Sequence, residues 1–315
     1  MAEASPAARR VVVAGASGLI GRALVASLHA DGIAVTRLVR RPPRTPDEVE
    51  WLTAAEPLDP DALAGADAVV ALNGASIGHL PWTARYRSSL LWSRLTPTRT
   101  LAAAVQALGS DAPALLSASA VGYYGSAPGA LLREDAAPGD TFLARLCVEW
   151  EDAALRAGTQ TRVALLRTAP VIHREGVLKP LLMLTRLGLG GPLARGTQVW
   201  PWITLDDEVR AIRHVIDAEI DGPVNLTAPT RATANDIGFA LAVRMNRPYV
   251  VRTPVWALRT ALSRAAADGL LLADAHVVPG VLDATGFTFA HADLEEAIAQ
   301  ALSSQALSAD SSLSD

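Results

Sequence analysis

Short apolar runs alternate with longer stretches of helical period through the first half of the chain. The apolar runs predict buried strands at 11–14, 32–39, a short one at Trp51, 66–72, 114–119 and 162–167. The stretches between them predict helices through 24–29, over 82–108 with Pro97 as a break or a start, and over 142–157. This alternation is typical of an α/β fold with a Rossmann-type, doubly wound parallel sheet.

The second half of the chain has more glycine near residue 190 and shorter apolar runs. Asp206 and Asp207 are placed to cap a helix over 208–218, and 233–236 has the form of a capping box before another helix. A short strand is expected at 225–228.

These changes predict a domain organisation. We expect a dinucleotide-binding Rossmann domain over 9–170, to which segments near 200–225 return, and a smaller substrate domain over most of 171–302. Residues 303–315 are serine-rich, as is typical of a disordered tail, and residues 1–8 are expected to be a disordered leader.

Three glycines follow the first predicted strand at a spacing of three residues. Gly15 is expected to allow a tight turn, Gly18 to let a pyrophosphate approach the backbone, and Gly21 to let the next helix pack closely on the strand. The free N–H groups at the start of that helix then face the phosphates. The motif predicts dinucleotide binding, whereas a plain strand–turn–helix corner would not need three glycines.

Two arginines stand where NAD-preferring sites carry an acidic residue. Arg40 comes 19 residues after Gly21, Arg41 follows, and neither is accompanied by an acid that would bind a ribose hydroxyl. An arginine there suits a 2′-phosphate, so we expect NADP(H); the alternative is a pair of solvated arginines.

The residues expected to contact the cofactor lie in this turn and at the ends of later strands. They are Gly15, Ser17, Gly18, Leu19, Ile20, Gly21, Arg40, Arg41, Leu72, Asn73, Gly74, Ser117, Ala118, Pro170 and Val171.

Composition narrows the class of protein. A net charge of −4 over 315 residues argues against binding to nucleic acid or to a membrane surface. A single cysteine and six scattered histidines predict no disulfide framework and no metal site. No apolar run is long enough to cross a bilayer, and the arginines before the first strand belong to the dinucleotide motif rather than a signal peptide. We therefore expect a cytoplasmic protein with a small-molecule substrate; its oligomeric state is not predicted.

Several segments together resemble the extended short-chain dehydrogenase/reductases, in the sugar-nucleotide epimerase-like subgroup. Residues 15–21 match the phosphate loop of that subgroup, 117–125 are similar to its fifth-strand signature, and 201–207 and 222–229 are similar to markers of its second half. Residues 246–248 and 286–289 resemble its small C-terminal domain. The resemblance covers nearly the whole chain.

This resemblance implies a Ser or Thr on the fifth strand and a Tyr-x-x-x-Lys on the next helix. Ser119 matches the serine, but the tyrosine and lysine places fall at about Phe142 and Leu146, so the usual proton donor is missing. We expect Ser119 and Tyr123 to be catalytic, with water or a hydroxyl of the substrate as other proton sources.

Three further residues, Tyr124, Trp200 and Trp202, are expected to contact substrate, with aromatic packing in the core as the alternative for each.

Three functions remain open at this point. The first is an NADPH-dependent ketoreductase, possible without the tyrosine because hydride transfer needs only a placed nicotinamide and a polarised carbonyl; atypical reductases of this kind resemble enzymes of aromatic polyketide and antibiotic biosynthesis. The second is an NAD(P)-dependent sugar-nucleotide epimerase. The third is a non-catalytic NADP(H)-binding regulator.

Overall fold

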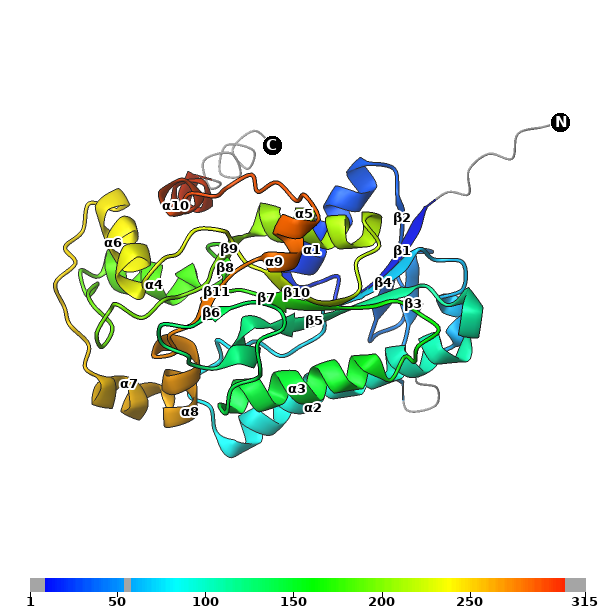
Figure 1. Ribbon diagram of the computed structural model, residues 1–315, viewed down its shortest axis with the longest axis horizontal. Helices are drawn as coiled ribbons and strands as arrows, with labels where there is room; N and C mark the ends of the chain where they lie inside the picture. Colours follow the sequence, from blue (N-terminus) through cyan, green and yellow to red (C-terminus); the bar gives the residue numbers. More distant parts are fainter. Residues whose placement is uncertain (1–8, 54–57, 304–315) are drawn as a thin grey trace.

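The computed structural model describes residues 9–53 and 58–303, which are built around one seven-stranded parallel sheet (Figure 1). Its strands are β1 (Arg10–Ala14), β2 (Ala34–Val39), β3 (Glu48–Glu50), β4 (Ala68–Ala71), β5 (Ala114–Ala120), β7 (Val163–Thr168) and β10 (Gly222–Leu226). They lie in the order β10-β7-β5-β4-β1-β2-β3, in which the chain winds outward in both directions from β1. The predicted doubly wound sheet is confirmed.

Helices cover both faces of this sheet (Figure 1). One face carries α1 (Leu19–Ala30) and α5 (Leu205–Asp217), and the other carries α2 (Ala84–Ala107) and α3 (Phe142–Leu155). Strand β1 is apolar at every buried position because its side chains alternate between two cores. Val11 and Val13 belong to the core under α1 and α5, and Val12 to the core under α2.

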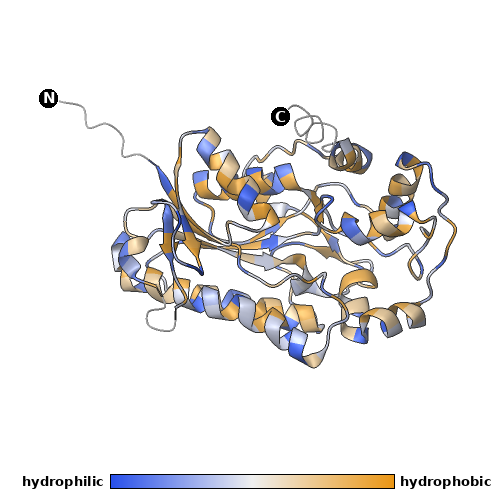
Figure 2. Cartoon of the chain, turned by 180° about the vertical axis from the view of Figure 1, so that it is seen from behind, coloured by the Kyte–Doolittle hydropathy of each residue, from blue (hydrophilic) through white to orange (hydrophobic). Residues whose placement is uncertain are grey.

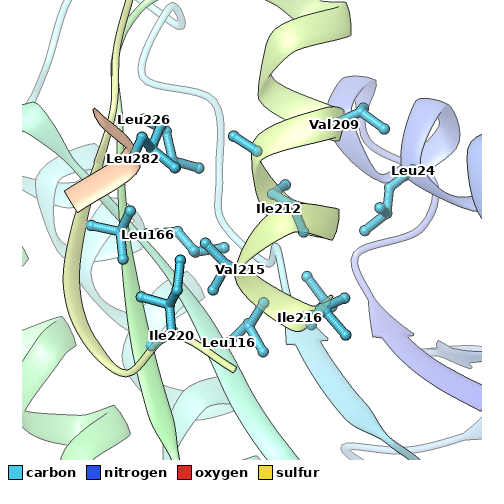
Figure 3. Packing of buried hydrophobic residues seen from close by; sticks show 14 of the residues in the cluster. Leu24, Leu116, Leu166, Val209, Ile212, Val215, Ile216, Ile220, Leu226 and Leu282 are labelled. Atoms are coloured by element: carbon cyan, nitrogen blue, oxygen red, sulfur yellow. The ribbon is translucent and has the colours of Figure 1, made fainter. Parts of the chain in front are cut away.

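Helix α5 shows how a helix is held on the sheet. Val209, Ile212 and Val215 recur along the buried side of this helix, and Figure 3 shows Val209 on the side toward α1. Val215 lies beside Leu166 of β7, and Leu24 extends the same core into α1 (Figure 3). The apolar side of α5 therefore holds the helix on the sheet and fixes the position of the residues at the N-terminus of α5.

The remaining elements are shorter, and most lie in the second half of the chain. The strands are β6 (Leu131–Leu132), β8 (Val171–Ile172), β9 (Ile203–Thr204) and β11 (His276–Val277); the helices are α4 (Leu178–Arg186), α6 (Ala234–Arg244), α7 (Val255–Leu262), α8 (Arg264–Ala266), α9 (Gly280–Ala284) and α10 (Leu294–Ser303). Helical turns occur at Pro60–Ala62, Gly109–Asp111, Val121–Tyr124 and Ala267–Leu271. Helices α4, α6, α7 and α8 gather at one end of the molecule (Figure 1). The sheet strands and the inward sides of the helices are largely hydrophobic in Figure 2.

Local predictions differ from the structure at four places. The short strand expected at Trp51 ends one residue earlier, and Trp51 itself is fully buried in the core. Pro97 lies inside α2 without ending it. Helix α5 begins at Leu205, so its cap is Thr204, whose hydroxyl accepts the N–H of Asp207, rather than the two aspartates. The strand expected at 225–228 begins earlier, at Gly222, and pairs with β7.

The other predicted elements agree more closely. The capping box at Thr233 and Asp236 is confirmed, with the side chain of each residue bonded to the backbone of the other. The leader at 1–8 and residues 304–315 of the expected tail lie outside the described residues, and Ser303 ends α10. In the part of the chain that is described, no helix combines the length and apolar character needed to span a bilayer.

Candidate cofactor site at the carboxyl edge of the sheet

The glycine-rich turn connects β1 to α1 and has the geometry of a phosphate-binding turn. Gly15 has φ +89°, a conformation that side chains rarely adopt. A Cβ atom at Gly21 would lie 2.3 Å from the carbonyl oxygen of Gly15, so Gly21 lets the helix approach the turn itself rather than the strand. Gly18 is exposed at the N-terminus of α1, and its N–H donates to Gly15 O at 3.0 Å. This leaves an open helix N-terminus suited to an anion.

The loop after β4 lies directly against this turn. A Cβ atom at Gly15 would lie 2.8 Å from the carbonyl carbon and oxygen of Leu72 and 3.2 Å from the backbone nitrogen of Asn73. The structure thus brings together Gly15, Leu72 and Asn73, as expected for two walls of one cofactor site. Ser17 is exposed at the same turn, and Leu19 and Ile20 form the first residues of α1.

The two arginines after β2 differ in their surroundings. Arg40 is exposed, whereas the Arg41 guanidinium donates two 2.8 Å hydrogen bonds to the Glu48 carboxylate, which is buried. This pairing lowers the pKa of Glu48 to about 2. Glu48 was not foreseen as a partner, and Arg41 is less available for a 2′-phosphate than predicted. Among the described residues, the Arg40 side chain has no hydrogen-bond or ion-pair partner, so its charge is available at this strand end.

The predicted residues of β5 are more deeply placed than expected. Ser117 is fully buried, and its hydroxyl donates to the carbonyl of Ala118, so the hydroxyl proton is not available to a ligand. Pro170 and Val171 follow β7, which pairs with β5, and Pro170 is exposed at the same edge of the sheet.

A buried polar network occupies the ends of β5 and β7. Ser119 donates a 2.6 Å hydrogen bond to Glu151, which also accepts two hydrogen bonds from Arg167 at 2.9 and 2.8 Å. Arg167 donates to the Tyr124 oxygen at 2.9 Å, and Tyr124 donates to Asn225 at 2.7 Å. All five side chains are buried. Such a closed network fixes these strand ends relative to α3.

Two predicted roles change because of this network. Tyr124 was expected to contact substrate, but it is 2 % exposed, its hydroxyl is used twice, and burial raises its pKa. Ser119 was expected to be catalytic, but its single proton is directed at Glu151. Neither side chain is free to act on a substrate in this arrangement.

Tyr123 is the exception among the predicted polar residues. It is half-buried, and among residues 9–53 and 58–303 no group forms a hydrogen bond with its hydroxyl. The Arg167 guanidinium carbon lies 3.6 Å from the centre of its ring, and the Tyr124 ring packs edge-on at 5.3 Å. A cation is thus stacked on the one tyrosine here whose oxygen is uncommitted.

Helix α3 faces the end of β5 one residue out of the predicted register. Leu143 lies against the Val121–Tyr124 turn, since a Cβ atom at Gly122 would be 3.3 Å from its side chain. Cys147 interacts with Ser119 and Ala120, and burial raises its pKa to about 12. The tyrosine and lysine places are therefore Leu143 and Cys147 rather than Phe142 and Leu146. The conclusion that this helix lacks the phenol and the amine is unchanged.

The two tryptophans near residue 200 lie in the core rather than along a substrate surface. Trp200 and Trp202 are 7 % and 1 % exposed and pack with residues of α4, α6 and α10. Their indole N–H groups donate to the carbonyl oxygens of Leu271 and Thr230. This correction favours the packing alternative for both.

Glu208, in the first turn of α5, was missed by sequence reasoning. One carboxylate oxygen accepts a 2.8 Å hydrogen bond from Thr168 at the end of β7, and the other has no partner among the described residues. Burial raises its pKa to about 8. The available signal was its place on the apolar stripe of the helix, four residues before Ile212.

A small acidic cluster near α5 has a structural explanation. Ligand atoms of Asp206, Asp207 and His291 lie within 4.8 Å of one another. The Asp207 oxygens, however, already accept the N–H groups of Ala290 and His291 and a hydrogen bond from Arg210. We therefore assign Asp207 to fastening the segment before α10 onto α5.

Two family patterns match the chain. The pattern of the NAD dependent epimerase/dehydratase family matches residues 11–226, and that of a domain of unknown function (DUF1731) matches residues 253–301. Epimerase family protein ML0860 of Mycobacterium leprae (strain TN) is 40 % identical over 304 residues, which are 96 % of this chain and 98 % of that protein.

Two solved structures are also similar. Human epimerase family protein SDR39U1 (isoform 2), crystallised with NADPH, is 31 % identical, with a TM-score of 0.83 over 93 % of this chain and 99 % of that one. A nucleoside-diphosphate sugar epimerase from Corynebacterium glutamicum is 32 % identical, with a TM-score of 0.76 over 95 % of this chain and 58 % of that one.

Proposed function

Because the chain belongs to the NAD dependent epimerase/dehydratase family, we propose that it is an NADP(H)-dependent oxidoreductase that reduces a ketone of a small molecule. The observation that carries the cofactor assignment is the turn at Gly15–Gly18, open at the helix N-terminus and packed on Leu72 and Asn73. The NADPH in the crystals of the human relative supports it. Arg40 is proposed to bind the 2′-phosphate.

The proposed reaction takes a hydride and a proton. When bound, NADPH supplies the hydride to the carbonyl carbon, and the cofactor leaves oxidised. The chain must then bind the ketone beside the nicotinamide and see that a proton reaches the carbonyl oxygen, which becomes the alcohol.

Tyr123 is the proposed proton donor. Its hydroxyl is uncommitted, whereas the hydroxyl of Ser119 donates to Glu151. The Arg167 charge 3.6 Å from its ring favours the negative charge that develops on the phenol oxygen as the proton leaves. The Glu151 carboxylate holds Arg167 in that position by two hydrogen bonds.

Sugar-nucleotide epimerisation is the second candidate, favoured by the similarity to the nucleoside-diphosphate sugar epimerase from Corynebacterium glutamicum. The two candidates differ in their use of the cofactor. A reductase consumes one NADPH for each product, whereas an epimerase oxidises and re-reduces its substrate with no net consumption. Following NADPH absorbance with a panel of ketones, and following isomer formation from nucleoside-diphosphate sugars, decides between them. Stoichiometric NADPH oxidation supports the reductase, and isomerisation without oxidation contradicts it.

A further inference from the structure

A buried arginine lies behind the cofactor loop and has no acidic partner. Arg94 of α2 is 9 % exposed, and among residues 9–53 and 58–303 no Asp or Glu forms an ion pair with it. Its contacts are the carbonyl oxygens of Leu90 and Ala75, at 2.9 and 3.1 Å, and the ring of Trp150, 5.0 Å away. Burial lowers its pKa, but a guanidinium stays charged in a protein. An unpaired buried charge is costly unless a ligand offsets it.

The position of Arg94 indicates where a ligand that offsets this charge would bind. A Cβ atom at Gly74 would lie 3.0 Å from its guanidinium carbon, so the charge is packed directly beneath the loop that follows β4. The preceding residues of that loop, Leu72 and Asn73, touch the phosphate turn at Gly15. The Asn73 side-chain oxygen is also buried without a partner among the described residues. An anion that rested between the turn and the loop would therefore lie on the same loop as this charge.

Helix α2 also holds the loop in place. The backbone N–H of Ala75 donates to Ser93 Oγ at 2.9 Å, and the carbonyl of Ala75 accepts from Arg94. Ser93 and Arg94 thus bind the backbone N–H and the carbonyl of Ala75, but only Arg94 carries a charge. This pair allows the charge to be tested apart from the mechanical role.

We propose that Arg94 is the buried positive charge of the cofactor site, a positioning residue that holds the loop at 73–75 and stabilises the diphosphate of a dinucleotide resting on it. This assignment rests on the proposed cofactor binding. Because the diphosphate is common to NADPH and NADH, the contribution of Arg94 is independent of the 2′-phosphate.

The test compares affinities by calorimetry in the full chain. Arg94→Gln removes the charge but keeps a hydrogen-bond donor, and it should weaken NADPH and NADH by the same factor, about tenfold or more. Arg94→Lys keeps the charge and should stay within about threefold of the wild type. Adenosine 2′-monophosphate, which lacks the diphosphate, should bind all variants equally.

Two control variants separate charge from structure. Ser93→Ala removes the other hydrogen bond to Ala75 without changing a charge, so it should weaken NADPH binding less than Arg94→Gln does. Arg99→Gln alters an exposed arginine of the same helix that lies over Trp92, and should have none. Unchanged NADPH binding in Arg94→Gln overturns the proposal, as does a loss in Arg94→Lys or Ser93→Ala equal to that in Arg94→Gln. Absence of NADPH binding to the wild type would instead contradict the proposed function.

Discussion

The Arg41 guanidinium is joined to the Glu48 carboxylate by two parallel hydrogen bonds of 2.8 Å, between the end of β2 and the start of β3. Arg40 has no such partner among the described residues, and we propose that it meets the 2′-phosphate. Arg40→Ala should weaken NADPH by at least about tenfold, as expected for a charge-assisted contact of about 1.5–3 kcal/mol, and leave NADH unchanged. Titration of both cofactors by calorimetry measures the ratio.

Arg41→Ala is the matched variant for this prediction. It leaves Glu48 buried without its bidentate partner, so its main effect should be a lower midpoint of thermal unfolding rather than a changed cofactor ratio. Equal affinities of the wild type for NADPH and NADH would contradict the role of Arg40. A larger ratio change in Arg41→Ala than in Arg40→Ala would move that role to Arg41.

Gly18→Val should abolish cofactor binding without unfolding the protein. A Cβ atom at Gly18 would meet only Gly15 O, at 3.4 Å, and its backbone has φ −74°, which any residue adopts. The branched side chain would nevertheless stand where a pyrophosphate meets the helix N-terminus. Full NADPH affinity in a folded Gly18→Val variant would show that this turn does not hold the cofactor.

Gly21→Ala provides the contrast within the same turn. Its Cβ atom would lie 2.3 Å from Gly15 O, so the turn must shift and thermal stability should fall. We therefore expect substitution of Gly18 to lower cofactor affinity and substitution of Gly21 to lower thermal stability. Comparing unfolding midpoints and cofactor titrations of the two variants checks this.

The buried Glu208 predicts a pH dependence of stability. Its pKa is raised from 4.5 to about 8 in the folded protein, so the native state keeps a proton that the unfolded state loses. Its contribution to stability is full below about pH 4.5 and is lost as the pH rises toward about pH 8. Glu208→Gln keeps an oxygen for Thr168 and removes this loss, so it should be the more stable form near neutral pH, by on the order of a few kcal/mol.

Denaturant unfolding across this pH range measures the effect, with the exposed Glu149→Gln as control. The gain of Glu208→Gln over the wild type should increase with pH, and Glu149→Gln should show no such trend. A gain that is constant with pH would mean that Glu208 is not protonated in the native state.

The sequence predicted the sheet well because buried parallel strands leave a plain signal. Strand β1 is apolar on both faces, and the glycine spacing after it constrains the backbone directly. The sequence did not predict which residues of α3 face the end of β5, because the long connection between the two elements does not determine the rotation of the helix about its axis. An error of one residue places Phe142 where Leu143 lies. The pairs Arg41–Glu48 and Ser119–Glu151 depend on tertiary distance, which no sequence period reports.

The predicted roles of Ser119 and Tyr123 separate in their effects on turnover. Tyr123→Phe should slow single-turnover NADPH oxidation by about 100-fold or more if its phenol gives the proton. It keeps the ring under Arg167, so stability should change little. Ser119→Ala should slow turnover less than about threefold but lower stability by about 1–3 kcal/mol, because it leaves Glu151 short of a buried donor.

A ketone with a neighbouring hydroxyl, and the same ketone with that hydroxyl methylated, complete the test in each variant. If Tyr123→Phe keeps full activity with the hydroxyl-bearing ketone but loses it with the methylated ketone, the substrate supplies its own proton. Absence of oxidation with every ketone, while NADPH binds normally, would favour a non-catalytic role.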